Sequence, residues 1–144
     1  MSKKISTSIK VSVIISPIDS KKDFFSYLLC LLNQNTSFYW EIVIIDTEND
    51  DTEKIITKLK LLYGDYIVYK KITGLLDKAV IQTVGKKTAN GELLIFLDLN
   101  MLPDKNFVQN QYDLFIQRKE YIFSQNQEYL SEELYKLRNH TLQS

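Results

Sequence analysis

Two carboxylates stand at the ends of apolar runs, where a ligand could reach them. Asp46 closes the run that starts at Glu41, and Asp98 closes the run that starts at Glu92. In an open α/β sheet, ligands bind beyond the carboxyl ends of the strands, so two such acids would meet at one rim. A carboxylate there accepts hydrogen bonds from a base or ribose, or ligates a hard cation that neutralises phosphate oxygens. The plainer interpretation is that each acid ends its strand and caps the next turn.

The apolar runs alternate with longer amphipathic stretches, a pattern typical of strands and helices around a mostly parallel sheet. Strands are predicted at residues 11–16, 41–46, 66–69 and 92–98, with a candidate fifth at 121–124. Helices are predicted from Ser20 to about residue 33, from the acidic turn after Asp46 to Gly64, over 75–88, from Pro103 onward and over 130–137. The predicted fold class is therefore α/β and Rossmann-like, with helices on both faces of the sheet.

The composition favours one globular domain. The chain has 144 residues, and domains commonly hold roughly 100–200. Eighteen Lys and Arg balance eighteen Asp and Glu, so no global field draws the chain to nucleic acid or anionic lipid. Cys30 is the single cysteine, which fits a reducing compartment, and the apolar run at 11–15 is too short for a membrane span. We expect a cytoplasmic protein with no membrane span and no nucleic-acid partner.

Three sequence blocks together resemble one known family. They are Val-Ser-Val-Ile-Ile-Ser-Pro-Ile-Asp at 11–19, Trp-Glu-Ile-Val-Ile-Ile-Asp-Thr-Glu-Asn-Asp-Asp-Thr at 40–52, and Ala-Asn-Gly-Glu-Leu-Leu-Ile-Phe-Leu-Asp-Leu-Asn-Met-Leu-Pro at 89–103. In this order and at this spacing they resemble the family 2 glycosyltransferases of the GT-A fold. The resemblance extends from about Val11 to Phe107. It implies a GT-A type sheet that binds a nucleoside diphosphate sugar.

The resemblance assigns nucleotide contacts to the ends of the first two strands. Asp46 corresponds by position to the Asp that reads the uracil or the ribose. The first-strand segment, usually Pro-Thr-x-Asn, here supplies Ser16, Pro17 and Asp19, so the hydroxyl expected near the base is displaced. Glu48 stands where the family's Asp-Asp-Gly-Ser motif has its Gly. These five residues are the nucleotide-binding candidates.

The resemblance also implies a divalent cation. The family's Asp-x-Asp, which holds Mg2+ or Mn2+ against the diphosphate, corresponds to Asp98-Leu99-Asn100. A neutral amide oxygen attracts a hard cation less than a carboxylate does, so phosphate oxygens must supply the missing charge. Asp98 and Asn100 are therefore predicted to bind Mg2+ or Mn2+ weakly and together with nucleotide.

Inverting sugar transfer needs a general base, and the sequence assigns no catalytic residue. In the family the base is an Asp of a later acidic motif, which by position would fall past residue 144. We expect residues 1–144 to form one truncated or minimal nucleotide-sugar-binding domain, completed by a C-terminal half or by a protein partner. The alternative is a non-catalytic GT-A-like module that serves as a partner or regulatory subunit.

Other charged groups have competing interpretations. Six acids between residues 41 and 53 could bind a cation, although acids before a helix more often stabilise its amino end. The pairs Lys70-Lys71 and Lys86-Lys87 could meet a diphosphate from opposite sides, although paired lysines are usually solvated. No glycine-rich dinucleotide motif or P-loop follows the first strand, which excludes those two nucleotide-binding classes.

Overall fold

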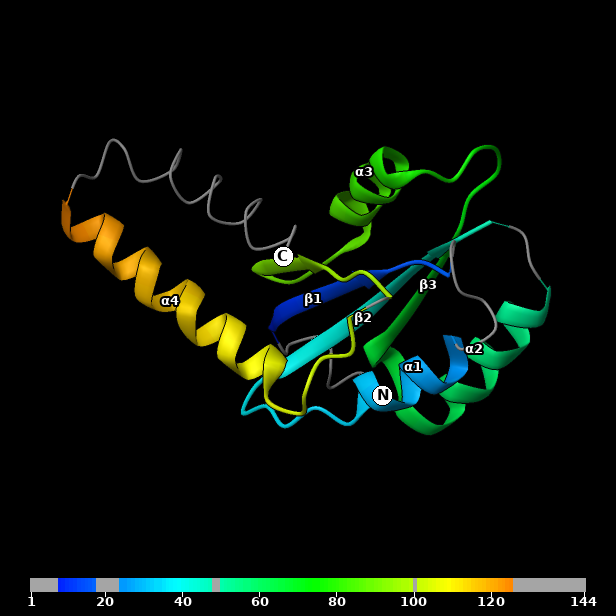
Figure 1. Cartoon of the computed structure of the whole chain (residues 1–144), viewed down its shortest axis with the longest axis horizontal. Coiled ribbons are helices and arrows are strands. Elements are labelled where there is room, and N and C mark those ends of the chain that lie inside the picture. Colours follow the sequence, from blue (N-terminus) through cyan, green and yellow to red (C-terminus); the bar gives the residue numbers. More distant parts are fainter. Residues whose placement is uncertain (1–7, 18–23, 48–49, 100, 126–144) are drawn as a thin grey trace.

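Four parallel strands form the centre of the molecule. The structure, a computed structural model, describes residues 8–17, 24–47, 50–99 and 101–125. Its strands are β1 (Ile9–Ile15), β2 (Tyr39–Asp46), β3 (Ile67–Lys71) and β4 (Leu93–Phe96), in the order β3-β2-β1-β4. All three strand pairs are parallel, and helices lie on both sides of the sheet (Figure 1). The α/β, Rossmann-like prediction is confirmed.

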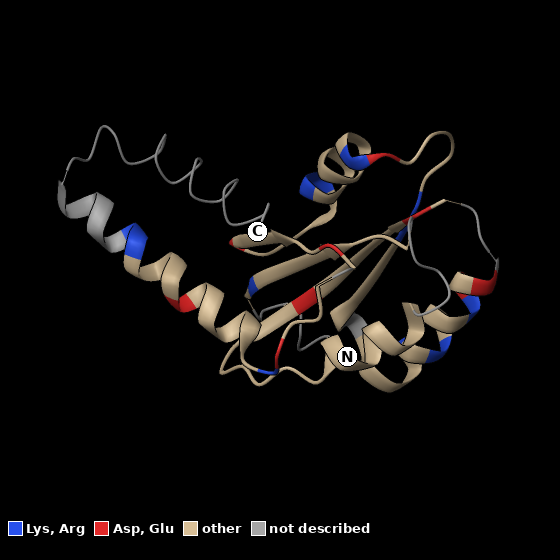
Figure 2. Ribbon diagram, in the orientation of Figure 1, with Lys and Arg blue, Asp and Glu red and all other residues tan. Residues whose placement is uncertain are grey.

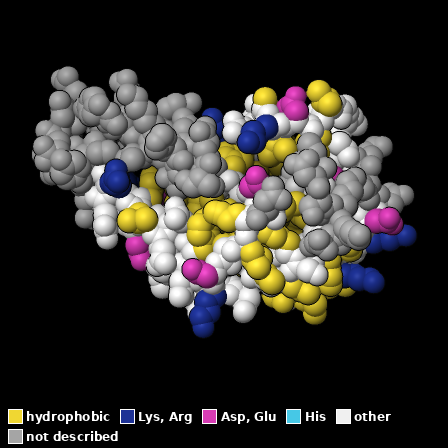
Figure 3. Space-filling view, in the orientation of Figure 1, with side chains coloured by type: hydrophobic (Ala, Val, Ile, Leu, Met, Phe, Trp, Pro, Cys, Tyr) yellow, Lys and Arg dark blue, Asp and Glu magenta, His cyan; other side chains and the backbone are white. Residues whose placement is uncertain are grey.

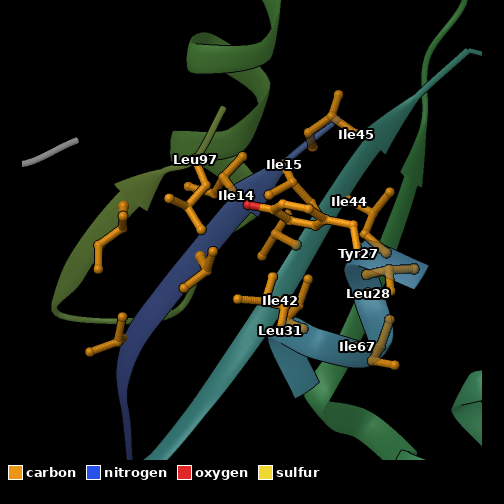
Figure 4. Packing of buried hydrophobic residues seen from close by; sticks show 14 of the residues in the cluster. Ile14, Ile15, Tyr27, Leu28, Leu31, Ile42, Ile44, Ile45, Ile67 and Leu97 are labelled. Carbon is orange, nitrogen blue, oxygen red and sulfur yellow. The ribbon is translucent and has the colours of Figure 1, made fainter. Parts of the chain in front are cut away.

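Helix α1 (Phe24–Leu32) and helix α2 (Asp50–Tyr63) lie on the same side of the sheet (Figure 1). The buried side chains of α1 join those of β2 in one apolar cluster, which Figure 4 shows from close by for Tyr27, Leu28 and Leu31. Each run of β-branched residues in β1 and β2 is apolar throughout because the sheet is covered on both faces. The strands therefore form the core, and their ends are left to carry polar groups.

Helix α3 (Lys78–Thr88) covers the opposite face and approaches the strands closely. A Cβ atom added at Gly85 would lie 2.9 Å from both Ile14 Cγ2 and Phe96 Cε1, so only glycine allows this distance. The helix begins after Asp77, whose side chain accepts a hydrogen bond from the Val80 amide at 2.9 Å. This cap explains why the helix starts at Lys78 and not at residue 75, as the apolar spacing predicts.

Helix α4 (Phe107–Gln125) leads away from the sheet after packing its first turns against it. Val108 is fully buried, and the ring of Tyr112 lies 4.8 Å from that of Phe38. The fifth strand predicted at 121–124 is wrong, because these residues continue α4. Four residues of alternating pattern are too few to outweigh the helix that begins at Phe107 and continues through them. No helix in the described part of the chain combines the length and apolarity needed to cross a bilayer.

Two predicted core positions face solvent instead. Cys30 lies in the leucine-rich stretch 28–32, which predicts packing in the core, yet it is exposed on α1. The spacing of Ile55, Ile56, Leu59 and Leu62 predicts one inward stripe, yet Leu62 is 77% exposed, whereas Ile56 and Leu59 are buried. Helix α2 ends as predicted at Gly64, which has a φ of 69° and opens a 3-10 turn (Gly64–Tyr66).

The amino edge of the sheet is closed by a buried carboxylate. Glu41 at the start of β2 accepts hydrogen bonds from Ser12 Oγ at 2.7 Å and from the Asn90 amide at 2.7 Å. Ser12 Oγ in turn accepts from the Gly91 amide at 2.8 Å. The Asn90-Gly91 turn before β4 is thereby fastened to β1 and β2.

Candidate functional site

The strand order creates a crevice at the carboxyl edge of the sheet. From β1 the chain adds β2 and β3 on one side, and then returns to place β4 on the other side of β1. The connections on the two sides of β1 therefore diverge, and such a switch point is where ligands bind in open α/β sheets. The register continues past β4, since the Leu97 amide donates to the Ile14 carbonyl at 3.0 Å. Residues just after β1 and β4 therefore lie side by side.

Ser16 and Pro17 follow β1 directly and are both buried. Ser16 is 6% exposed, and its Oγ atom has no hydrogen-bond partner within the described residues. A buried hydroxyl without a partner costs free energy, and most such groups in folded proteins are satisfied. At the switch point, Ser16 therefore offers a donor and an acceptor that this part of the chain does not use.

Asp46 ends β2 at the same edge, but its carboxylate is enclosed. The residue is 1% exposed, and Oδ1 accepts from the Thr47 amide at 2.8 Å while Oδ2 accepts from Tyr69 Oη at 3.0 Å. Its carbonyl also accepts from the Ile72 amide at 2.8 Å. The prediction that Asp46 stands at the carboxyl edge is confirmed, and its side chain there ties β2 to β3.

Asp98 follows β4 and is exposed at the rim of the crevice. Tyr27 of α1 supports this segment from below, because its Oη donates to the Met101 carbonyl at 2.7 Å and lies 3.5 Å from the Asp98 carbonyl. The Met101 amide donates to the Asp98 carbonyl at 3.0 Å, which closes a turn over residues 98–101. Burial, and secondarily the charge of Asp98, raises the pKa of Tyr27 to about 12. The phenol thus stays protonated and keeps its donor.

The two carboxylates predicted to meet lie at one edge but on different strands. β1 separates them, so their backbones stand roughly 10 Å apart, which is two interstrand spacings. Asp19, Glu48 and Asn100, the other predicted site residues, lie outside the described residues. The structure therefore brings Ser16, Pro17 and Asp98 to one crevice, with Asp46 buried beside it.

The described residues offer a cation only a partial set of ligands. They contain no group of three or more His, Cys, Asp or Glu side chains that could hold a metal ion. Asp98 contributes one exposed carboxylate, which fits a Mg2+ or Mn2+ ion only if a ligand brings further oxygen atoms. Such a site would depend on bound diphosphate.

The alternative cation and lysine arrangements are wrong. Glu41 and Asp46 lie at opposite ends of β2, so these two acids do not meet, and Glu48 lies outside the described residues. Lys86 and Lys87 lie in the last turn of α3, at the amino edge of the sheet and far from the crevice. Lys71 binds Glu53 through a 2.9 Å ion pair. Figure 2 shows the charges dispersed over separate elements.

Two tyrosines that hold the site were not among the sequence candidates. Tyr27 belongs to the apolar stripe of α1, where spacing alone marks it as a core residue. Tyr69 lies on β3 opposite Ile44, and its hydroxyl reaches the side chain of Asp46, two residues further along β2. A buried tyrosine usually finds a hydrogen-bond partner, and this tendency is the signal that the sequence contains. The partner itself is known only from the fold.

The parallel sheet and its switch point define a Rossmann-like α/β protein with its ligand-binding edge at the strand carboxyl ends. The sequence matches the family model for Glycosyl transferase family 2 over residues 12–143, and the chain belongs to this family. The sequence resemblance to family 2 glycosyltransferases is thereby confirmed. A search of curated proteins gave no match.

Solved structures similar to this chain include two of S. aureus TarS. The crystal structure of TarS 1-349 has a TM-score of 0.61 and 22% identity, and the match covers 78% of this chain and 33% of that one. A second TarS structure has a TM-score of 0.60 and 22% identity, covering 78% of this chain and 20% of that one. These likenesses support the GT-A type fold. The chain spans about a third or less of the length of these proteins.

Proposed function

We propose that the carboxyl edge of the sheet binds a nucleoside diphosphate sugar. The observation that carries this proposal is the Oγ atom of Ser16, which is buried at the switch point between β1 and β4 and has no hydrogen-bond partner among the described residues. A ligand with hydrogen-bonding edges, such as a base or a ribose, would satisfy that atom. Membership of Glycosyl transferase family 2 supports a glycosyl donor as the ligand.

Each described residue has a distinct role in this proposal. Ser16 and Pro17 contact the nucleoside, since both follow β1 at the floor of the crevice. Asp46 acts next to them. Its two carboxylate oxygens each accept one hydrogen bond within the fold, from the Thr47 amide and from Tyr69 Oη, and their remaining lone pairs accept hydrogen bonds from the ligand. Asp19 and Glu48 complete the predicted nucleotide contacts.

In this proposal, Asp98 binds the diphosphate end of the ligand through a cation. With Asn100 it would hold Mg2+ or Mn2+, which supplies charge neutralisation for the leaving diphosphate. Tyr27 fixes the backbone on which Asp98 stands. Because one carboxylate and one amide bind a cation only weakly, the cation and the nucleotide would each depend on the other for binding.

Sugar transfer is the activity that we propose for this site when a general base and an acceptor site are present. The base would take the proton of the acceptor hydroxyl while the hydroxyl oxygen attacks the anomeric carbon of the sugar and the nucleoside diphosphate leaves. We propose that another part of the protein or a protein partner supplies both. The catalytic residue itself remains unassigned.

A non-catalytic partner or regulatory module is the second candidate. It is favoured by the enclosure of Asp46, whose two carboxylate oxygens already accept hydrogen bonds within the fold. In this role the Asp46 carboxylate only holds β2 to β3. Sugar transfer by the isolated chain in a turnover assay would exclude it.

Calorimetry with UDP and GDP, with and without Mn2+, tests the binding proposal. We expect binding that Mn2+ strengthens, and the Asp98→Ala variant should lose about tenfold or more of that Mn2+ effect. Asp113→Ala is the matched control, because Asp113 is an exposed carboxylate on α4. Absence of binding by wild type to any nucleoside diphosphate would overturn the proposal.

A further inference from the structure

The outer faces of α1 and α2 expose large apolar side chains. Leu61 and Leu62 of α2 are 83% and 77% exposed. Phe25 and Leu29, one turn apart on α1, are 42% and 41% exposed. Figure 3 shows the resulting hydrophobic area low in the view, over these two helices. We call these four residues the apolar face.

Aromatic side chains line a cavity at one end of the two helices. A cavity of about 200 Å³ lies between their carboxyl-terminal ends and is lined by Leu32 of α1 and Tyr63 of α2. Tyr39 and Tyr66, which stack with ring centroids 5.7 Å apart, line the same cavity. Exposed apolar area of this kind commonly marks a site of protein or membrane interaction.

Lysines accompany the exposed leucines in the second half of α2. Helix α2 carries its acids in its first turn, as Asp50, Asp51 and Glu53, and Glu53 is paired with Lys71. From residue 54 to the end of α2 the only charged residues are Lys54, Lys58 and Lys60, and all three are exposed. Helix α1 contains no charged residue. Figure 2 shows the acidic end and the lysines on α2.

We propose that the apolar face docks on a lipid surface that carries anionic headgroups. Exposed leucines next to lysines are the features of a helix that lies in the membrane interface, with its apolar side chains inserted and its lysines among the headgroups. The lysine stems reach past the leucines and keep the ammonium groups in the polar layer. The whole chain has a net charge of zero, so the total charge does not reveal the local group of Lys54, Lys58 and Lys60.

A lipid surface fits the face better than a second protein does. Leu61 and Leu62 protrude, since more than three quarters of each is exposed, and neither of them lines the cavity at the ends of the helices. Protruding leucines enter a fluid acyl layer without needing a matched surface.

Co-sedimentation with vesicles tests the proposal. We expect wild type to bind vesicles of equal parts phosphatidylglycerol and phosphatidylcholine, and to bind pure phosphatidylcholine far less. The Leu61→Ser/Leu62→Ser variant should bind at least about tenfold more weakly. Lys58→Gln should lose about fivefold, and high salt should act in the same direction.

The matched control is Leu75→Ser/Leu114→Ser, which removes two exposed leucines elsewhere in the chain. This control should bind the mixed vesicles as wild type does. Equal loss in both double variants, or binding that ignores lipid charge, would overturn the proposal. A concentration-dependent dimer in sedimentation velocity that the Leu61→Ser/Leu62→Ser variant abolishes, without vesicle binding by wild type, would overturn it in favour of self-association.

Discussion

Two phenols hold the groups at the carboxyl edge in place. Tyr69 donates to a buried carboxylate, and Tyr27 donates to a carbonyl in the turn that carries Asp98. Each hydroxyl therefore acts on the geometry of the proposed site through another residue. Substitution by phenylalanine removes the hydroxyl and keeps the ring, so it isolates this effect.

The Tyr69→Phe substitution should destabilise the fold. Asp46 would lose the donor to Oδ2 while its carboxylate stays buried, which costs about 1–3 kcal/mol for an unsatisfied buried group. Urea unfolding measures this loss of free energy. Tyr39→Phe is the control, because Tyr39 is half exposed and surface changes usually stay within about 0.5 kcal/mol. Equal unfolding midpoints for the two variants would contradict this role of Tyr69.

Tyr27 should make the folded state sensitive to alkaline pH. Its pKa rises from 10.0 to about 12 on folding, so the folded state holds the proton more tightly than the unfolded state does. This stability is complete below pH 10 and is lost as pH rises toward 12. Ultraviolet titration should show one tyrosine that ionises later than exposed tyrosines and is missing in Tyr27→Phe. Identical titration curves above pH 10, apart from the lost amplitude of an ordinary tyrosine, would contradict this assignment.

At the scale of elements, close contacts decide how β4 joins the sheet. The Asn90-Gly91 turn places the Gly91 amide on Ser12 Oγ. A Cβ atom at Gly91 would lie 2.6 Å from the Ser12 amide nitrogen and 2.7 Å from the Val11 carbonyl carbon. These are backbone atoms of β1, and they cannot move without breaking the ladder.

Gly91→Ala should therefore destabilise the protein by about 3 kcal/mol, at the upper end of ordinary overpacking. Gly85→Ala should cost less, about 1–2 kcal/mol, because its Cβ would meet the side chains of Ile14 and Phe96. Thermal and urea unfolding of both variants give the comparison. A smaller loss for Gly91→Ala than for Gly85→Ala would show that the turn can move away from β1.

The sequence predicts an element correctly where many residues share one pattern. It fails where a single tertiary contact decides the start of a helix or the exposure of a side chain. The strands at 11–16 and 41–46 were predictable because continuous β-branched runs indicate buried parallel strands. The start of α3 depends on Asp77 and the course of the chain after Gly74, where φ is 94°. The exposure of Leu62 depends on where α2 leaves the sheet. Such tertiary effects are absent from local spacing.

At the scale of the molecule, the position of the proposed site was more predictable than the hydrogen bonding of its residues. Strand periodicity and the order of the three sequence blocks predict that Ser16, Asp46 and Asp98 stand at one edge, and they do. Neither signal predicts that Tyr69 encloses Asp46 or that Ser16 Oγ is left without a partner in the described chain. Both facts arise from packing between β1, β2 and β3. They decide which group is available to a ligand.

Amide chemical-shift mapping of the labelled chain, titrated with UDP and GDP in the presence of Mg2+, tests the central claim most directly. The account predicts saturable shifts centred on Ser16, Thr47 and Leu99, with little change at Asn90 and Gly91 on the amino edge. Shifts centred on the amino edge, or none at saturating nucleotide, would contradict it.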